Sequence, residues 1–338
     1  MIDLTVVWAG IIAFAIVAYV LMDGFDLGIG LFFPWLEAGE ERDAAMNSIA
    51  PVWDGNETWL ILGGGGLLAA FPLAYAIVLP ALYAPFIAML LALVLRGVAF
   101  EFRWRDPAHR RWWDRAFHAG SLVATFAQGI TLGALLQGIR IEGRAYAGGW
   151  WDWLTPFSLL TGASLVVGYA LLGACWLIWK TEGSLQGKAY ARARLAAALL
   201  LLAIGAVSLA TLGLEAKYYQ RWLAFPGVIA TAQVPLALLI VSVLFFRALH
   251  ARREALPFFL ALALFALTFV GLAISIWPDV IPARLTIWQA AAPERSQVFM
   301  LIGAGLTVPL ILAYTGWAYW VFRGKVGHEG YHSWRPPG

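Results

Sequence analysis

Apolar residues run through this chain in long stretches separated by short polar connections. A helix that crosses the roughly 30 Å hydrocarbon layer of a bilayer needs about 20 mostly apolar residues. By this measure the pattern predicts about nine transmembrane helices in one polytopic membrane domain covering residues 1–338, so the expected fold class is an all-α integral membrane protein. The predicted spans are residues 5–34, 57–79, 81–102, 117–138, 156–179, 194–214, 228–248, 257–277 and 298–322, followed by a short cytoplasmic tail at 324–338.

The least regular boundary lies between the second and third predicted spans. Pro72, Pro80 and Pro85 interrupt an apolar stretch that is too long for one crossing. Because proline cannot continue the hydrogen-bond pattern of a helix, we predict two helices here, joined by a very short hairpin.

The composition excludes a soluble globule. Hydrophobic residues make up 62% of the chain and charged residues 13%, and the mean hydropathy is +0.76. A soluble core cannot hide that much apolar surface. The net charge of +3 gives no support to nucleic-acid binding. The single cysteine, Cys175, excludes an internal disulfide and a cysteine-based metal site, and we expect it to be a small buried residue.

The basic residues predict the orientation. Most of the 23 lysines and arginines lie in the connections after the first, third, fifth and seventh spans and in the C-terminal tail. Cytoplasmic loops carry the excess of basic residues. We therefore expect the N-terminus outside, the C-terminus in the cytoplasm, and an odd number of spans.

Ionisable side chains inside spans are the strongest functional signal. Each costs about 2.5–3.5 kcal/mol on insertion scales, so such residues mark functional candidates. They occur in the motifs MDGFDLGIG, WDGNETWL and LRGVAFEFR. The candidates are Asp23 and Asp26 in the first span, Asp54 and Glu57 at the start of the second, and Arg96 and Glu101 near the end of the third.

The depths of these residues predict a shared layer. At about 1.5 Å per residue, Asp23 lies about 22 Å along its helix from Trp8, near the inner face. The second span enters from that face at Asp54, and Arg96 lies about 24 Å from the hairpin at Pro80. We therefore expect a polar cluster on the cytoplasmic side, with Arg96 as the charge partner of the carboxylates.

Two interpretations of this cluster stay open. Carboxylates that lie close together and are partly desolvated suit a relay of protons from the cytoplasm, with Asp54 as the leading candidate. Alternatively, Asp23 and Arg96 form a plain ion pair, while Asp54 and Glu57 stabilise the positive N-terminus of a helix.

Haem ligation by this chain alone is not expected. Membrane haem sites need axial ligands such as His or Met that face each other within a bundle. None of the five histidines forms such a pair within the predicted spans. We predict no metal site and no catalytic residue in this chain.

Small residues within the spans allow close helix packing. The run Gly63–Gly66 is the clearest case. Packing is the simpler interpretation, and a contact of Trp53, Gly63 and Gly64 with a quinone or lipid tail is the alternative. For polar residues such as Gln128 we expect hydrogen bonds between helices.

Several motifs resemble subunit II of the cytochrome bd family of quinol oxidases. MDGFDLGIG at 22–30 and NSIAPVWDGNETWLI at 47–61 carry most of the resemblance. It extends to LLQGI at 135–139, RLTIWQA at 284–290 and PLILAYTGWAYW at 309–320, and therefore runs from end to end. Two positions depart from the family pattern. Glu57 stands where many relatives have Gln. Gln289 stands where many relatives have Asp, so the role of that Asp on the outer side is not transferred to this chain.

The resemblance implies a fold, a reaction and partners. The expected fold is two four-helix bundles plus one peripheral helix, in the bacterial cytoplasmic (inner) membrane. The expected reaction is the reduction of oxygen to water with quinol in the respiratory chain, in a complex whose haem-bearing subunit I holds two haems b and haem d. The resemblance also implies contacts with quinol and lipid, a possible bound quinone and a possible single-span accessory subunit.

The resemblance also assigns site residues. Asp54 matches the family's proton-entry Asp, and Asp23 and Asp26 match its DGFD pair. Arg96 and Glu101 match the family's Arg and acidic positions. The short outer connections resemble the cyanide-insensitive branch.

Two other functions fit a membrane protein with buried acids. A stand-alone proton-coupled transporter is the main alternative, but transport sites lie near the midplane of repeated halves, and we find no repeat. A purely scaffolding subunit differs from the oxidase interpretation only in lacking a proton role for Asp54.

Overall fold

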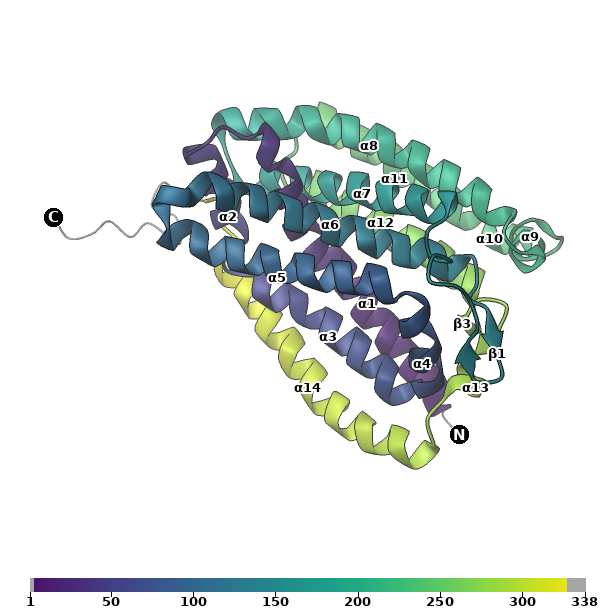
Figure 1. The fold of residues 1–338 in the computed structure, drawn as a ribbon. Helices are drawn as coiled ribbons and strands as arrows, with labels where there is room; N and C mark the ends of the chain where they lie inside the picture. Colours follow the sequence, from purple (N-terminus) through teal and green to yellow (C-terminus); the bar gives the residue numbers. More distant parts are fainter. Residues whose placement is uncertain (1–2, 327–338) are drawn as a thin grey trace.

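Long apolar helices run side by side through the protein, whose computed structural model describes residues 3–326 (Figure 1). Eight of the described helices are long and apolar enough to cross a membrane, and the bent pair α3–α4 adds a ninth span if it is counted as one. The long helices are α1 (Leu4–Phe32), α3 (Trp53–Ala70), α4 (Pro72–Ala81), α5 (Tyr83–Arg105), α6 (Arg110–Leu136), α7 (Pro156–Lys180), α8 (Gly183–Leu212), α11 (Gln233–His250), α12 (Leu256–Ile276) and α14 (Glu294–Val321).

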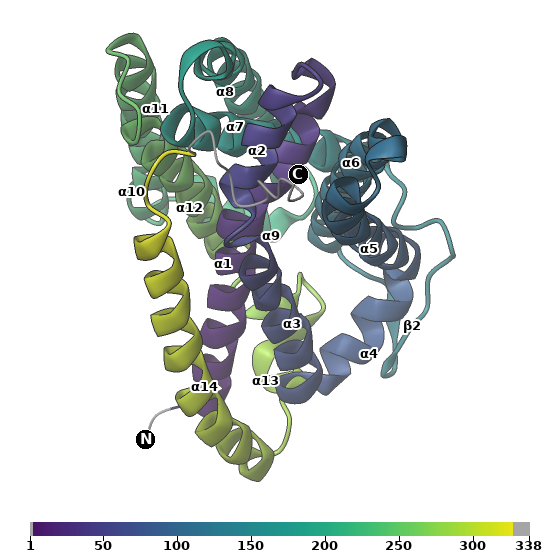
Figure 2. The same ribbon diagram turned by 90° about the vertical axis from the view of Figure 1, so that its left-hand side faces the viewer.

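The helices form two groups of four and one outlying helix, as expected. In the first group α1 packs against α3 and α6, and α5 packs against α6. In the second, α7 packs against α8 and α12, and α11 packs against α12. Contacts of α7 with α1 and α6 join the groups, while α14 lies outside against α1 and α3 (Figures 1 and 2). The fold is an all-α integral membrane protein.

Short elements connect the long helices. At the end of the molecule where α3 begins lie α2 (Glu40–Ile49) and two single-turn 3-10 helices, η1 (Phe33–Trp35) and η2 (Pro107–His109). At the opposite end lie two antiparallel hairpins, β1 (Ile141–Glu142) with β2 (Ala145–Tyr146) and β3 (Asp279–Ile281) with β4 (Leu285–Thr286). The remaining short helices are α9 (Ala216–Leu223), α10 (Val228–Thr231) and α13 (Ile287–Ala290).

The predicted span 57–79 needs a correction. Helix α3 ends at Ala70, and the chain bends by 119° between α3 and α4. Phe71 and Leu82 adopt non-helical backbone angles, each directly before a new helix, so the chain turns twice where one hairpin was expected. Pro72 at the first position of α4 explains the first turn, because its ring fixes φ and it has no N–H to donate.

Other boundaries differ because helices continue beyond the apolar layer. The helices predicted at 117–138 and 194–214 begin earlier, at Arg110 and Gly183. A hydropathy measure detects the hydrocarbon-spanning part only, whereas backbone hydrogen bonds persist among polar residues. The predicted span 228–248 also divides, into α10 and α11.

The first and last helices run parallel along the molecule. At one end the Trp8 Nε1 donates to the Gln297 carbonyl oxygen (3.1 Å), so α1 and α14 begin together. At the other end the Lys180 Nζ donates to the carbonyl of Phe322 (2.8 Å) just after α14. An odd number of crossings makes the first and last helices run in the same direction.

The predicted tail 324–338 is described only in part. Residues from 327 onward lie outside the described part, and Lys325 pairs with Glu182 and Glu254.

A close backbone contact between helices joins the two groups through glycine. A Cβ added to Gly28 on α1 would lie 2.1 Å from the Tyr169 carbonyl oxygen and 2.7 Å from the Gly173 nitrogen on α7. The backbones can approach this closely only without side chains. Cys175 is fully buried in the same part of α7, as expected for a small core residue.

We predict that Gly28→Ala lowers the thermal stability of the detergent-solubilised protein. Overpacking costs about 1–3 kcal/mol, and here the added carbon meets backbone atoms that cannot rotate away. Thermal unfolding followed by circular dichroism measures the change. The matched control is Gly10→Ala on the same helix, which meets nothing within 4 Å and should be neutral or slightly stabilising. Equal behaviour of the two variants would contradict the prediction.

Candidate functional site

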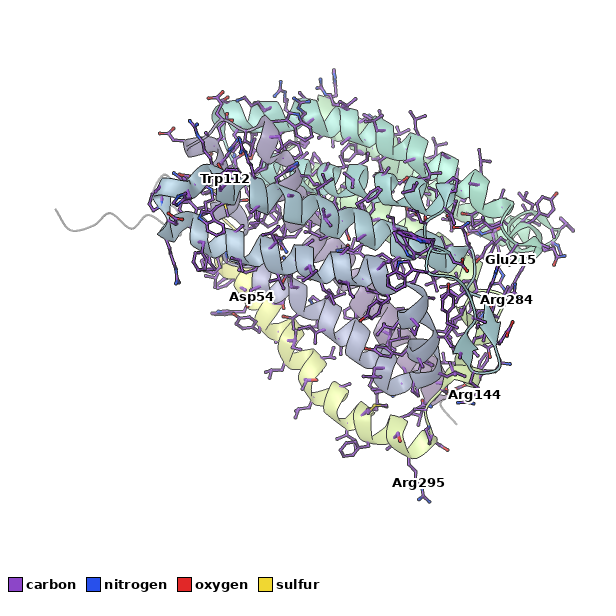
Figure 3. The ribbon with its side chains drawn as sticks, in the orientation of Figure 1. Asp54, Trp112, Arg144, Glu215, Arg284 and Arg295 are labelled. Atoms are coloured by element: carbon purple, nitrogen blue, oxygen red, sulfur yellow. The ribbon has the colours of Figure 1, made fainter. Side chains whose placement is uncertain are left out.

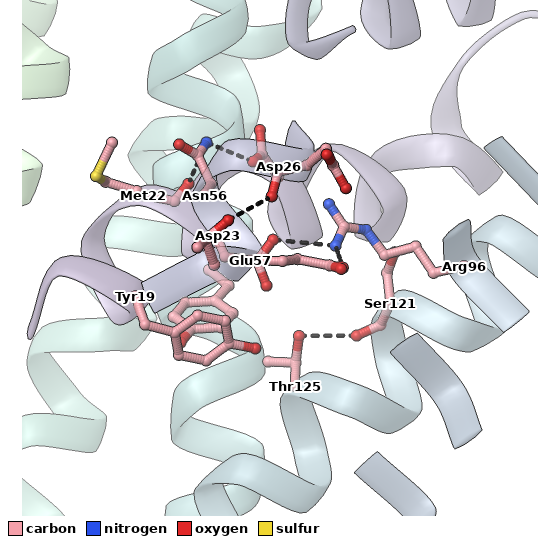
Figure 4. A network of polar contacts seen from close by, with 12 residues as sticks. Tyr19, Met22, Asp23, Asp26, Asn56, Glu57, Arg96, Ser121 and Thr125 are labelled. Carbon is pink, nitrogen blue, oxygen red and sulfur yellow. Dashed lines mark hydrogen bonds and ion pairs between the residues drawn. The ribbon is translucent and has the colours of Figure 1, made fainter. Parts of the chain in front are cut away.

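A buried arginine holds three helices together. Arg96 on α5 is fully buried, and its Nη1 lies 3.0 Å from Asp23 Oδ1 on α1 and 2.5 Å from Glu57 Oε1 on α3 (Figure 4). Both contacts are charge-assisted hydrogen bonds. The structure thus brings together acids from two predicted spans and the arginine of a third.

A second acid extends this cluster toward the outlying helix. Asp26 lies one turn after Asp23 and is also fully buried. Its Oδ2 accepts a hydrogen bond from Asn56 Nδ2 (2.6 Å), and Asn56 Oδ1 accepts one from the Tyr319 hydroxyl on α14 (3.0 Å). Asn56 therefore connects the acid cluster to α14.

A chain of uncharged polar groups lies on the opposite side. The Tyr19 hydroxyl interacts with Asp23 and accepts a hydrogen bond from Gln128 Nε2 (2.6 Å). Gln128 Oε1 accepts from the Tyr169 hydroxyl on α7 (3.0 Å). The expected interhelical role of Gln128 is confirmed, whereas no sequence signal identified Tyr19, Tyr169 or Tyr319, which look like ordinary aromatic residues in apolar runs.

Local sequence explains the placement of the charged groups. Asp23 and Asp26 are three residues apart and share one helix face. Glu57 lies in the second turn of α3, which begins at Trp53. Gly120 allows α6 to approach Arg96, because an added Cβ would lie 2.9 Å from the Arg96 nitrogen. The guanidinium is therefore enclosed, and it also lies 5.8 Å from the Trp53 ring centre.

The cluster retains unused hydrogen-bonding capacity. Asp23 Oδ2, Asp26 Oδ1 and the Nε and Nη2 of Arg96 are buried and make no hydrogen bond within the described part of the chain. Arg96 contacts the carboxyl groups of Asp23 and Glu57, and Asp26 adds a third acid, which is buried and has no ion pair among residues 3–326, so the acids outnumber their countercharge. A cluster of this kind can bind protons at several neighbouring oxygens.

Two predicted members lie outside the cluster. Asp54 is exposed in the first turn of α3, one turn before Glu57, and its charge acts on Glu57 (Figure 3). Glu101 lies beyond Arg96 on α5 and pairs with Arg105 at 3.7 Å in a largely exposed contact. Asp54 is thus positioned between the surface and the cluster, while the structure separates Glu101 from it.

The glycine run on α3 divides between two faces. Gly63 and Gly66 are buried, and an added Cβ would lie 3.4 and 3.1 Å from Ile16 and Ile12 of α1. Gly64 is exposed with nothing within 4 Å. Trp53 is partly buried against Phe100, with ring centres 4.8 Å apart. Close packing explains Gly63, while a quinone or lipid contact of Trp53 and Gly64 stays a prediction.

A second ionic group holds the polar connection in place. Arg103 on α5 is buried, and it pairs with Asp114 on α6 (2.6 Å) and with Asp43 on α2 (2.8 Å). Asp43 also pairs with Arg110, and Asp114 with Arg42 (2.6 Å). These contacts fix α2 on the bundle and so position the start of α3. Sequence reasoning treated the residues as loop charges, because hydropathy does not reveal that they meet.

Comparison with known proteins gives the family. The sequence profile described as cytochrome bd terminal oxidase subunit II matches residues 4–322. The chain belongs to the cytochrome bd terminal oxidase subunit II family. The cytochrome bd ubiquinol oxidase subunit 2 of Bacillus subtilis is 32% identical, over 95% of this chain and 96% of that protein. The cytochrome bd-I ubiquinol oxidase subunit 2 of Escherichia coli K12 is 28% identical, over 96% and 95%.

A solved structure supports the fold of this subunit II family member. The bd oxidase structure from Geobacillus thermodenitrificans contains a chain that matches with a TM-score of 0.78 at 18% identity, covering 95% of this chain and 99% of that chain. At this identity the match supports the fold alone.

Two histidines of this subunit II, which are potential haem or metal ligands, already have partners within the described part of the chain. Haem iron needs axial ligands such as His, Met, Cys or Tyr. His109 pairs with Asp106, and the Nδ1 of His118 bonds to the Gly30 carbonyl oxygen (2.9 Å). Within residues 3–326 no group of three His, Cys, Asp or Glu side chains could hold a metal ion.

We predict that Arg96→Gln destabilises the protein strongly. Removing one partner of a buried ion pair costs about 3–5 kcal/mol, because the remaining charge is uncompensated. Arg105→Gln on the same helix is the matched control, since exposed pairs contribute about 0–1 kcal/mol. Yield and thermal unfolding in detergent measure both. A stability loss for Arg96→Gln no larger than that of the control would contradict the prediction.

Proposed function

We propose that this chain, as subunit II of a cytochrome bd-type quinol oxidase, carries protons from the cytoplasm toward the oxygen-reducing centre of its partner. The observation that carries the proposal is the buried cluster of Asp23, Asp26 and Glu57 around Arg96. The half-reaction that reduces oxygen to water consumes protons, whereas quinol oxidation releases its protons at the quinol site. The oxygen-reducing centre therefore needs a proton supply of its own.

The excess of acids over arginines supports proton binding rather than a purely structural role. A plain ion pair needs one acid for each base, but here Arg96 pairs with two acids, and a third acid, the buried Asp26, lies one helix turn from Asp23. A buried charge without a countercharge is costly. The cluster therefore lowers its energy by holding protons, which a relay requires.

Asp54 provides the connection to the surface. It is exposed, precedes Glu57 by one helix turn, and lies at the α2 end of the molecule (Figure 3). We place this end in the cytoplasm, with the N-terminus outside and nine spans in the bacterial inner membrane, because the basic residues concentrate there. Arg144, Arg284 and Arg295 lie at the opposite end (Figure 3). Glu101 belongs to this route only as a secondary surface acid.

The redox chemistry belongs to the partner in this proposal. We assign the two haems b and haem d to subunit I, as the resemblance to the family implies, and the partners that His109 and His118 already have in this chain support that assignment. Haem in subunit I would carry electrons from quinol to oxygen, while this chain supplies packing and protons. A bound quinone and a single-span accessory subunit are compatible with the exposed apolar faces of α3 and α14.

The depth of the acids argues against a stand-alone transporter. Glu57 lies in the second turn of α3 and the cluster forms where this helix begins, whereas transport sites lie near the midplane between repeated halves. The helix break in α3–α4 lies far from these acids, at Phe71.

We predict that Asp54→Asn reduces quinol oxidase turnover at least about tenfold with haem content unchanged. Loss of a proton-transferring group typically costs factors of this order or larger. Glu57→Gln should also lower turnover, because it removes the next acid. Oxygen consumption with saturating quinol, together with the haem spectrum, measures both effects.

The matched control for Asp54→Asn is Glu40→Gln, which removes an exposed carboxylate from α2 at the same end. Its turnover should equal that of the unsubstituted enzyme. Unchanged turnover in Asp54→Asn would leave subunit II a scaffolding role only.

We also predict that the haem spectrum depends on the partner. A complex purified in mild detergent should contain a second large chain and absorb in the red as haem d does. This chain expressed alone should be colourless. Haem bound by the isolated chain would contradict the assignment to subunit I.

A further inference from the structure

A pocket of about 330 Å³ lies between the end of α1 and the start of α8. One wall is apolar and aromatic, with Phe32, Trp35, Leu36 and Leu195. The other carries the cationic side chains of Lys188 and Arg192. The pocket therefore has an apolar part and a charged part, unlike the purely apolar surface of a lipid-facing helix.

The sequence of α8 places this pocket at the membrane boundary. Residues 195–212 contain no charged side chain, whereas the first part of the helix carries Lys188, Arg192 and Arg194. The change from charged to apolar residues thus occurs within the pocket wall. Trp35, about half exposed, lies at the same level, as tryptophans at the headgroup layer do.

Arg192 is the available cation of the pocket. Its guanidinium lies 5.1 Å from the Trp35 ring centre, and it makes no ion pair or hydrogen bond with residues 3–326. Lys188, in contrast, donates to Glu37 (2.7 Å) and to both oxygens of Glu41 (2.8 and 3.0 Å). Arg192 can therefore bind an anion without losing an existing partner.

The charged side chains at the pocket balance one another. Lys188 and Arg192 line the pocket, and the acids Glu37 and Glu41, which both pair with Lys188, lie beside it, so the four formal charges sum to zero. Although burial opposes it, hydrogen bonds from Lys188 hold the pKa of Glu41 below its usual value, so this acid is ionised at neutral pH. A ligand with one anionic and one cationic group matches this pattern.

We propose that the pocket binds a phosphatidylethanolamine-type phospholipid from the leaflet at the α2 end. The phosphate pairs with Arg192, the ammonium group with Glu37, and the upper acyl chain lies against Phe32 and Leu195. A guanidinium suits phosphate because its N–H groups match two phosphate oxygens. The site is independent of the proton cluster.

Native mass spectrometry of the whole delipidated oxidase, titrated with phosphatidylethanolamine, tests the proposal. Arg192→Gln should weaken the tightest lipid binding about fivefold, since a basic residue near a membrane surface contributes about 1 kcal/mol. Ala191→Phe, which fills the pocket without changing charge, should weaken it as well. The matched control is Arg115→Gln, which removes an exposed arginine that lies 5.0 Å from the Trp112 ring centre outside this pocket.

Two further binding measurements identify the chemistry of the ligand. Phosphatidylglycerol, which lacks the ammonium group, should bind more weakly than phosphatidylethanolamine, and Glu37→Gln should remove that preference. Inorganic phosphate should not displace the lipid, because it cannot use the apolar wall. The proposal fails if Arg192→Gln binds lipid like the control, if the two lipids bind equally, or if inorganic phosphate displaces the lipid.

Discussion

The contact of Arg96 with two carboxylates is the interaction on which the rest of the structure depends. It joins α1, α3 and α5 at one depth, inside an apolar bundle where an unpaired charge has no water to stabilise it. Packing brings these helices near one another, but apolar contacts are tolerant of sliding. The buried ion pairs fix the register between the helices, and the positions of Asp26, Asn56 and Tyr319 follow from it.

The sequence predicted the elements of this arrangement better than their connections. Hydropathy identified the long helices, and intramembrane charge identified Asp23, Asp26, Glu57 and Arg96, because both signals arise from the cost of transfer into lipid. The turn at Phe71 was misplaced, since a proline shows that a helix is interrupted but not at which neighbouring residue. Glu101 was predicted to belong to the cluster, but it lies outside it and pairs with Arg105. The prediction used only the depth of the residue along the helix, which does not give the direction of a side chain around the helix axis.

Partners that contribute through uncharged groups were the hardest to predict. Tyr19, Tyr169 and Tyr319 stand in apolar runs where tyrosine is common, and only the fold shows their hydroxyl groups turned toward amides and acids. The ionic group around Arg103 was missed for a different reason. Its members come from three separate segments of polar sequence, and long-range contacts between such segments leave no periodic pattern.

The two carboxamides that flank the acids have a consequence for the direction of charge movement. Asn56 and Gln128 accept and donate hydrogen bonds, but neither has a proton to release at neutral pH. On the sides of α14 and α7 the acids therefore face carboxamides that do not exchange protons at neutral pH. In the proposed relay, these two carboxamides would keep hydrogen ions from leaking sideways through the polypeptide, which would dissipate the membrane potential.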